Sequence, residues 1–165
     1  MVPPVPLRFP LRLEPFGYTI RRRRRRRVQS YSAYKATRRR RAAYAARYEK
    51  AWLDRIPTYT GGVSSRLSEH AASVGSAGYD DALAELLAVP HLFEELLGSA
   101  PTQRTSELAN VLREHAGAVK GYAETWHSYL SENNVAARSD ALTLRDTSVY
   151  LSKEAFRLLA EVAKA

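Results

Sequence analysis

The sequence contains no cysteine, which excludes disulfide bonds and zinc sites with thiolate ligands and fits a reducing compartment. It contains no run of about 18 to 20 apolar residues and no apolar stretch in residues 1–20 of the kind found in signal peptides. Glycine-rich phosphate loops and the Gly-x-Ser-x-Gly motif of hydrolases are absent as well. We therefore expect a soluble protein of the cytoplasm, or of an organelle matrix in a eukaryote, that is not secreted, needs no cofactor and is not an enzyme.

Acidic residues are scarce in the first third of the chain. Residues 1–55 hold 17 of the 26 Lys and Arg residues but only three acids, which gives a net charge of +14. The remaining residues hold nine basic and 14 acidic side chains, a net charge of −5. This asymmetry is typical of a basic segment that binds nucleic acid or an anionic surface, joined to a separate domain.

Two uninterrupted arginine runs carry most of the positive charge, residues 21–27 and residues 38–41. Arginine stays protonated at every relevant pH and binds phosphate through two parallel hydrogen bonds, so these runs favour a polynucleotide partner. Such contacts position a nucleic acid without reading its sequence. The alternatives are a solvated charge run, a signal like those for nuclear import that a receptor reads, and an anchor to an anionic membrane.

The first 29 residues are predicted to form an extended arm rich in proline and arginine. They hold five of the eight prolines, and proline fixes φ and removes a backbone donor. Residues 30–55 hold neither glycine nor proline and are rich in Ala, Arg, Lys and Tyr, which predicts a basic helix that begins near Ser30 or Ser32 and ends before Pro57. Residues 56–62 are predicted to be a linker because they combine a proline with two glycines.

Aromatic side chains recur along the predicted basic helix. Tyr44, Tyr48 and Trp52 follow one another at four-residue spacing, with Tyr31 and Tyr34 earlier. Aromatic rings among arginines suit RNA or single-stranded DNA, whose bases offer π faces. Docking of the stripe of Tyr44, Tyr48, Trp52 and Ile56 onto the following domain is the favoured interpretation, since aromatic residues at helical spacing are more often core residues. The candidate nucleic-acid-binding residues are Arg21, Arg22, Arg23, Arg24, Arg25, Arg26, Arg27, Tyr31, Tyr34, Lys35, Arg38, Arg39, Arg40, Arg41, Tyr44 and Arg47.

Residues 63–165 are predicted to form a compact antiparallel bundle of three or four helices, which makes the fold all-α. Helices are expected at 63–74, at 80–97 with a kink or break at Pro90, and from Thr102 or Thr105 to Asn133. The last element is ambiguous. The spacing favours one helix from Asp140 to the C-terminus, whereas the β-branched residues in 147–151 favour a short strand before a helix at 153–164.

One pair of residues has the spacing of a metal-binding motif. Glu124 and His127 resemble the Glu-x-x-His ligand pair of ferritin-like di-iron bundles, but those bundles use two such motifs and this chain has one. A solvent-exposed pair is expected here, with no metal. His70, His91 and His115 are interpreted as surface or boundary residues.

The sequence therefore predicts a structural nucleic-acid-binding component of a larger assembly. Residues 8–50 are expected to bind nucleic acid, RNA in preference to DNA, while the bundle docks to a protein partner; self-association is left open. The alternative is a structural adaptor, or an accessory protein of a phage or mobile element, whose basic arm binds an acidic protein surface, DNA or a membrane.

Overall fold

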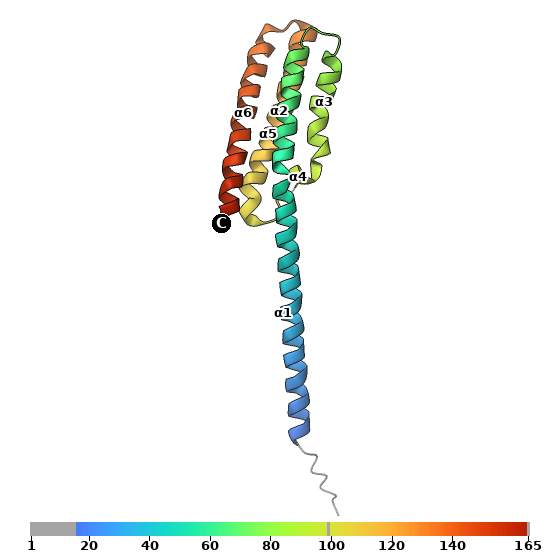
Figure 1. Ribbon diagram of the computed structural model, residues 1–165, viewed down its shortest axis with the longest axis vertical. Coiled ribbons are helices and arrows are strands. Elements are labelled where there is room, and N and C mark those ends of the chain that lie inside the picture. The colour runs from blue at the N-terminus through green and yellow to red at the C-terminus, as the bar shows by residue number, and fades with distance from the viewer. Residues whose placement is uncertain (1–15, 99, 165) are drawn as a thin grey trace, which may run out of the picture. The chain divides into compact units, whose positions relative to one another are not determined.

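The computed structural model describes the backbone of residues 16–98 and 100–164 and the side chains from residue 30 onward (Figure 1). The chain divides into two compact units, residues 1–43 and residues 44–165. The described residues contain no strand, so the predicted all-α fold is confirmed. The elements in chain order are α1 (Phe16–Asp54), α2 (Ile56–Ser73), α3 (Tyr79–Leu92), α4 (Glu94–Gly98), the short 3-10 helix η1 (Gln103–Thr105), α5 (Ser106–Glu132) and α6 (Val135–Lys164).

Helix α1 begins earlier than the sequence analysis predicted. Its first residue is Phe16, directly after Pro15, and not Ser30 or Ser32. The chain then has no further proline until Pro57, and arginine and alanine are strong helix formers. Residues 16–29 of the predicted extended arm therefore have a helical backbone, whereas residues 1–15 lie outside the described residues.

The predicted linker of residues 56–62 is the first part of helix α2. Pro57 lies at the start of this helix, where its missing N–H costs nothing, and Gly61 and Gly62 follow within the helix. Ile56 and Tyr59 are fully buried. Burying each such side chain contributes about 1.5 to 3 kcal/mol, which outweighs the roughly 1 kcal/mol that each helical glycine costs.

Residues 44–165 contain the predicted antiparallel bundle. Helices α2, α3, α5 and α6 lie side by side, and successive helices run in opposite directions (Figure 1). The division between α3 and α4 falls at Phe93, close to the kink or break predicted at Pro90. The N–H of Phe93 donates to the carbonyl oxygen of Pro90 at 3.2 Å. Helix α5 ends at Asn133, which has a left-handed φ of 49°.

The ambiguous last element is a single helix. Helix α6 begins at Val135, five residues before Asp140, and the β-branched segment 147–151 is helical. Small side chains on its buried face allow close packing. The burial gained in the helix outweighs the local preference of residues 147–151 for a strand. The buried residues of α6 are Ala137, Ala141, Ser148, Leu151, Ala155 and Leu158.

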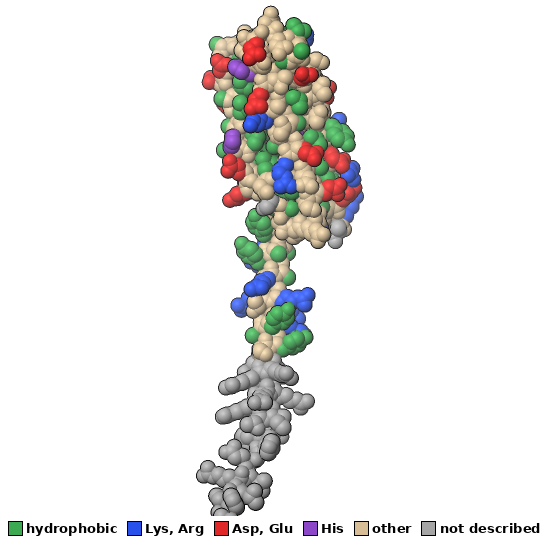
Figure 2. All heavy atoms as spheres, turned by 180° about the vertical axis from the view of Figure 1, so that it is seen from behind, with side chains coloured by type: hydrophobic (Ala, Val, Ile, Leu, Met, Phe, Trp, Pro, Cys, Tyr) green, Lys and Arg blue, Asp and Glu red, His purple; other side chains and the backbone are tan. Residues whose placement is uncertain are grey.

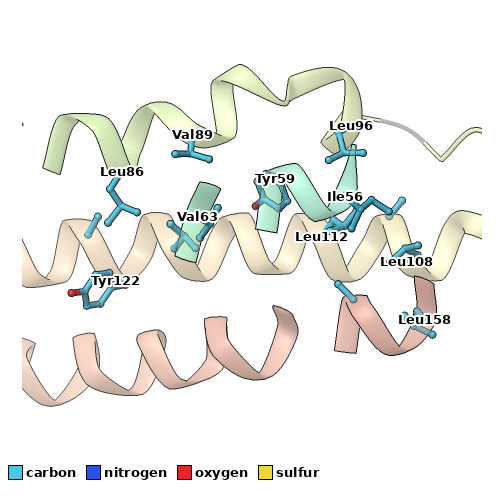
Figure 3. Close-up of a cluster of buried hydrophobic side chains, with 14 of the residues drawn as sticks. Ile56, Tyr59, Val63, Leu86, Val89, Leu96, Leu108, Leu112, Tyr122 and Leu158 are labelled. Atoms are coloured by element: carbon cyan, nitrogen blue, oxygen red, sulfur yellow. The ribbon is translucent and has the colours of Figure 1, made fainter. Parts of the chain in front are cut away.

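The core of the bundle collects apolar side chains from every bundle helix (Figure 3). The cluster joins residues far apart in sequence, so the bundle has one continuous core. The residues labelled in the figure are Ile56, Tyr59, Val63, Leu86, Val89, Leu96, Leu108, Leu112, Tyr122 and Leu158.

Two histidines lie inside this core, which corrects the expectation that they are surface or boundary residues. His115 is 1% exposed, and its Nδ1 and Nε2 atoms lie 3.1 Å from the Tyr59 hydroxyl and 3.2 Å from the Ser148 hydroxyl. Each hydroxyl can donate or accept, so a neutral imidazole is satisfied in either tautomer. His70 is fully buried, with its Nδ1 atom 3.1 Å from the hydroxyl of Tyr122. His91 is exposed, as predicted.

Burial makes the stability of the bundle depend on pH. It lowers the pKa of His115 from 6.5 to about 4. Between these two values the unfolded chain binds a proton that the folded chain does not, so stability should fall as the pH falls through this window. We expect a loss of about 1 kcal/mol between about pH 7.5 and pH 5.5 from this residue. Urea denaturation of the wild type and His115→Gln measures it: the variant should show the smaller pH dependence, and equal dependence would contradict the assignment.

A second prediction concerns two glycines in α5. An added Cβ at Gly117 meets no atom within 4 Å, whereas at Gly121 it lies 3.3 Å from a Leu144 methyl carbon. Gly117→Ala should therefore stabilise the bundle by about 1 kcal/mol through helix propensity alone. Gly121→Ala should gain less or lose stability because Leu144 must move. Thermal denaturation of both variants tests the contrast, and an equal gain at the two sites would show that α6 does not restrict this position.

Candidate nucleic-acid interface

Every described residue from Ser30 to Tyr48 is exposed. The local sequence explains why this stretch of α1 is helical without being covered. Ala, Arg and Lys favour the helix, while no apolar stripe exists in residues 30–43 to bury against a neighbour. This stretch therefore presents its side chains to solvent on all sides.

The four arginines of residues 38–41 are consecutive, and successive helical residues differ by about 100° in direction, so together they surround the helix. No ion pair involves them, Lys35, Arg47 or Lys50 within the described part of the chain. Figure 2 shows such Lys and Arg side chains interspersed with hydrophobic ones along α1. The predicted phosphate-binding groups from residue 35 onward are thus accessible.

Cations of the bundle are arranged differently. Six of the ten Lys and Arg residues from Arg55 to Lys164 lie within 4 Å of a carboxylate, so their charge is compensated locally. The pairs are Arg55–Glu95, Arg66–Glu69, Arg66–Glu85, Arg104–Glu49, Lys120–Glu124, Arg145–Asp146, Arg157–Glu154 and Arg157–Glu161. The contrast arises from sequence, because residues 30–48 contain no acid at all.

The aromatic stripe that was predicted to dock is split. Trp52 is 3% exposed, and its indole N–H donates to the Leu96 carbonyl oxygen at 3.1 Å. Tyr44 and Tyr48 are 73% and 46% exposed. The docking interpretation is therefore correct for Trp52 and for the fully buried Ile56, and wrong for the two tyrosines. Because Tyr48 is exposed, we add it to the candidate interface; it was not among the binding residues predicted from the sequence.

A polar clamp accompanies Trp52 within residues 44–165. The carboxylate of Glu49 is buried and accepts hydrogen bonds from the guanidinium of Arg104, one of them 2.8 Å long. The Thr102 hydroxyl and the Arg104 guanidinium lower the pKa of Glu49, so the carboxylate stays charged. Directly after the end of α1, Arg55 pairs with Glu95 at 3.1 Å. These contacts hold residues 49–55 to the bundle.

A hollow of about 540 Å³ lies beside this clamp. Two carboxylates and two cations line it with apolar side chains, so it has no net charge that would select a polyanion. Its lining residues are Ala46, Glu49, Lys50, Leu53, Asp54, Pro57, Arg104, Leu159 and Ala163.

The arginines at positions 21–27 belong to helix α1 by their backbone, and their side chains lie outside the described residues. Their assignment to the interface stays a prediction. Tyr31, Tyr34, Lys35, Arg38–Arg41, Tyr44 and Arg47 are described, and all of them are exposed.

Two arrangements elsewhere resemble chemical sites in their composition. Ser148 and His115 form a hydroxyl–imidazole pair, but both are 1% exposed, so a substrate cannot reach them. Glu124 and His127 are exposed, and Glu124 lies 3.7 Å from the ammonium of Lys120. Within residues 16–98 and 100–164 no group of three or more His, Cys, Asp or Glu side chains is placed to hold a metal ion.

Comparison with known proteins gives no relative: no family model, curated protein or solved structure matches the chain. Among the described helices none combines the length and the apolar composition needed to span a membrane. The proposal for function therefore depends on the residues themselves.

The split of the aromatic stripe predicts unequal effects on stability. Trp52→Ala should destabilise the bundle by about 3 to 5 kcal/mol because it removes a buried ring and its hydrogen bond. Tyr44→Ala should change stability by about 0.5 kcal/mol or less because its ring is in water. Urea denaturation followed by circular dichroism measures both. Equal destabilisation by the two variants would mean that Tyr44 is docked.

Proposed function

We propose that this protein is a non-enzymatic nucleic-acid-binding component of a larger assembly. Its basic helix neutralises phosphates, and its bundle docks to protein. The observation that carries the proposal is the accessible charge of the seven Lys and Arg residues in 35–50, none of which forms an ion pair among the described residues, whereas six cations from Arg55 onward do. These seven cations form no ion pair among the described residues and repel one another, and a polyanion would relieve this repulsion.

The mechanism follows from the chemistry of the phosphate backbone. Each Lys or Arg that contacts a phosphate releases condensed counterions, which makes binding favourable and strongly dependent on salt. Guanidinium groups that surround the helix can bind phosphates on more than one side of it. Recognition of this kind carries little sequence information.

RNA is proposed as the preferred ligand, ahead of DNA. RNA in cells presents single-stranded loops and bulges whose bases are available to aromatic side chains. Tyr31 and Tyr34 lie among the cations of residues 30–43 with 60% and 63% of their surface exposed. Rings beside phosphate-binding groups suit such a ligand better than a uniform duplex.

The bundle supplies a different kind of surface. It has a net charge of −5, and acidic side chains occur over much of the face seen in Figure 2. Helix α6 exposes Val149 and Phe156, which lie seven residues apart and hence on one side of the helix, at 46% and 45% exposure. These features support docking to protein and disfavour a second nucleic-acid contact.

Removing the arginine run tests the proposal. Replacement of Arg38, Arg39, Arg40 and Arg41 by Gln should reduce the slope of log affinity against log salt by about 3 for single-stranded RNA, because each phosphate contact contributes about 0.7. The matched control replaces four exposed bundle cations, Lys120, Arg138, Lys153 and Lys164, by Gln and should leave the slope nearly unchanged. Fluorescence anisotropy with labelled RNA measures both.

Two outcomes would contradict the proposal. Equal effects of the two variants would mean that total charge matters and not the basic helix. Binding of the wild type to anionic vesicles or to an acidic protein, with no binding to RNA or DNA at the same salt concentration, would favour the adaptor alternative.

A further inference from the structure

Four tyrosines on α1 are more exposed than packing explains. Tyr31 and Tyr34, on residues 30–43, are 60% and 63% exposed, and Tyr44 and Tyr48, on the segment that follows, are 73% and 46% exposed. Tyrosine is a weaker helix former than the Ala, Arg and Lys around it, so local folding does not favour it here. Neither the core nor helix propensity gives these rings a role.

The rings are paired with cations at one-turn spacing. The ammonium of Lys35 lies 4.7 Å from the ring centroid of Tyr31, a cation–π contact. Arg38 follows Tyr34 by four residues, and Arg47 follows Tyr44 by three, which places each beside its tyrosine on the helix surface. Three of the four rings therefore have a phosphate-binding group within one helical turn of about 5.4 Å, and Tyr48 lies one turn beyond Tyr44.

This pairing matches the two parts of an unpaired nucleotide. A base stacked on the ring and its phosphate bound by the neighbouring cation use both groups at once. A base inside a duplex is stacked on its neighbours and presents only its edges in the grooves, so a ring on the surface of a helix cannot stack on it. Such an arrangement would favour an unpaired strand over a duplex and would read no sequence.

We propose that Tyr31, Tyr34, Tyr44 and Tyr48 stack on unpaired bases and that the chain prefers single-stranded to duplex nucleic acid. This inference rests on the proposed function, because it assigns the kind of nucleic acid that the basic helix binds. Charge supplies binding to any strand, and the tyrosines supply the preference.

The test compares a variant in which all four tyrosines are leucine with one in which they are phenylalanine. Stacking is worth about 1 to 3 kcal/mol per base, so the leucine variant should lose at least tenfold in affinity for a short single-stranded RNA or DNA. Its affinity for a duplex of the same length and its salt slope should hardly change. The phenylalanine variant should keep the single-strand affinity, because stacking needs the ring and not the hydroxyl.

Tyr150 is the matched control, since it is 64% exposed and lies on α6 beside Asp146. Tyr150→Leu should change no affinity.

A second readout needs no substitution: irradiation of a 5-iodouracil-substituted single strand bound to the wild type should crosslink the four tyrosines of α1 and leave Tyr150 unlabelled.

The outcomes separate the two proposals. No binding of the wild type to any nucleic acid would overturn the proposed function and this inference with it. If the wild type binds but the leucine variant loses affinity equally for single strand and duplex, stacking alone is overturned. The same holds if the leucine variant loses affinity for neither. Unchanged circular dichroism of the variants excludes a loss of helix as the cause.

Discussion

Uncompensated positive charge on a single helix is the constraint on which the rest of the structure depends. Residues 30–48 contain no acid, so the charge of Arg38–Arg41 has no intramolecular partner there. A helix of this composition cannot be buried, because removing unpaired cations from water costs several kcal/mol for each. The core of the bundle therefore takes no side chain from residues 30–48, and the charged stretch stays available to a polyanion.

The bundle itself is held together by burial and by local ion pairs. Trp52 and the Glu49–Arg104 pair fix the end of α1 to residues that follow it in sequence. His115 joins α2, α5 and α6 because its two ring nitrogens meet hydroxyl groups from Tyr59 and Ser148. Polar groups thus specify the packing, while the apolar side chains supply most of the stability.

Features governed by local chemistry could be predicted from the sequence. The end of α1 before Pro57, the break near Pro90 and the end of α5 at Asn133 each follow from one residue's backbone preference. The described cations of the candidate interface were also predicted, because charge density alone makes exposure necessary. For the same reason no long-range information was needed to place them in solvent.

Features governed by tertiary contacts could not be predicted from the sequence. The glycines after Pro57 indicated a linker, but the burial of Ile56 and Tyr59 makes the segment helical. The burial of His115 depends on partners from α2 and α6, which spacing within α5 does not show.

Hydrogen–deuterium exchange with and without RNA tests the central claim most directly: protection on binding should appear in residues 30–50 and not in α5 or α6. Protection confined to the bundle helices would contradict the account.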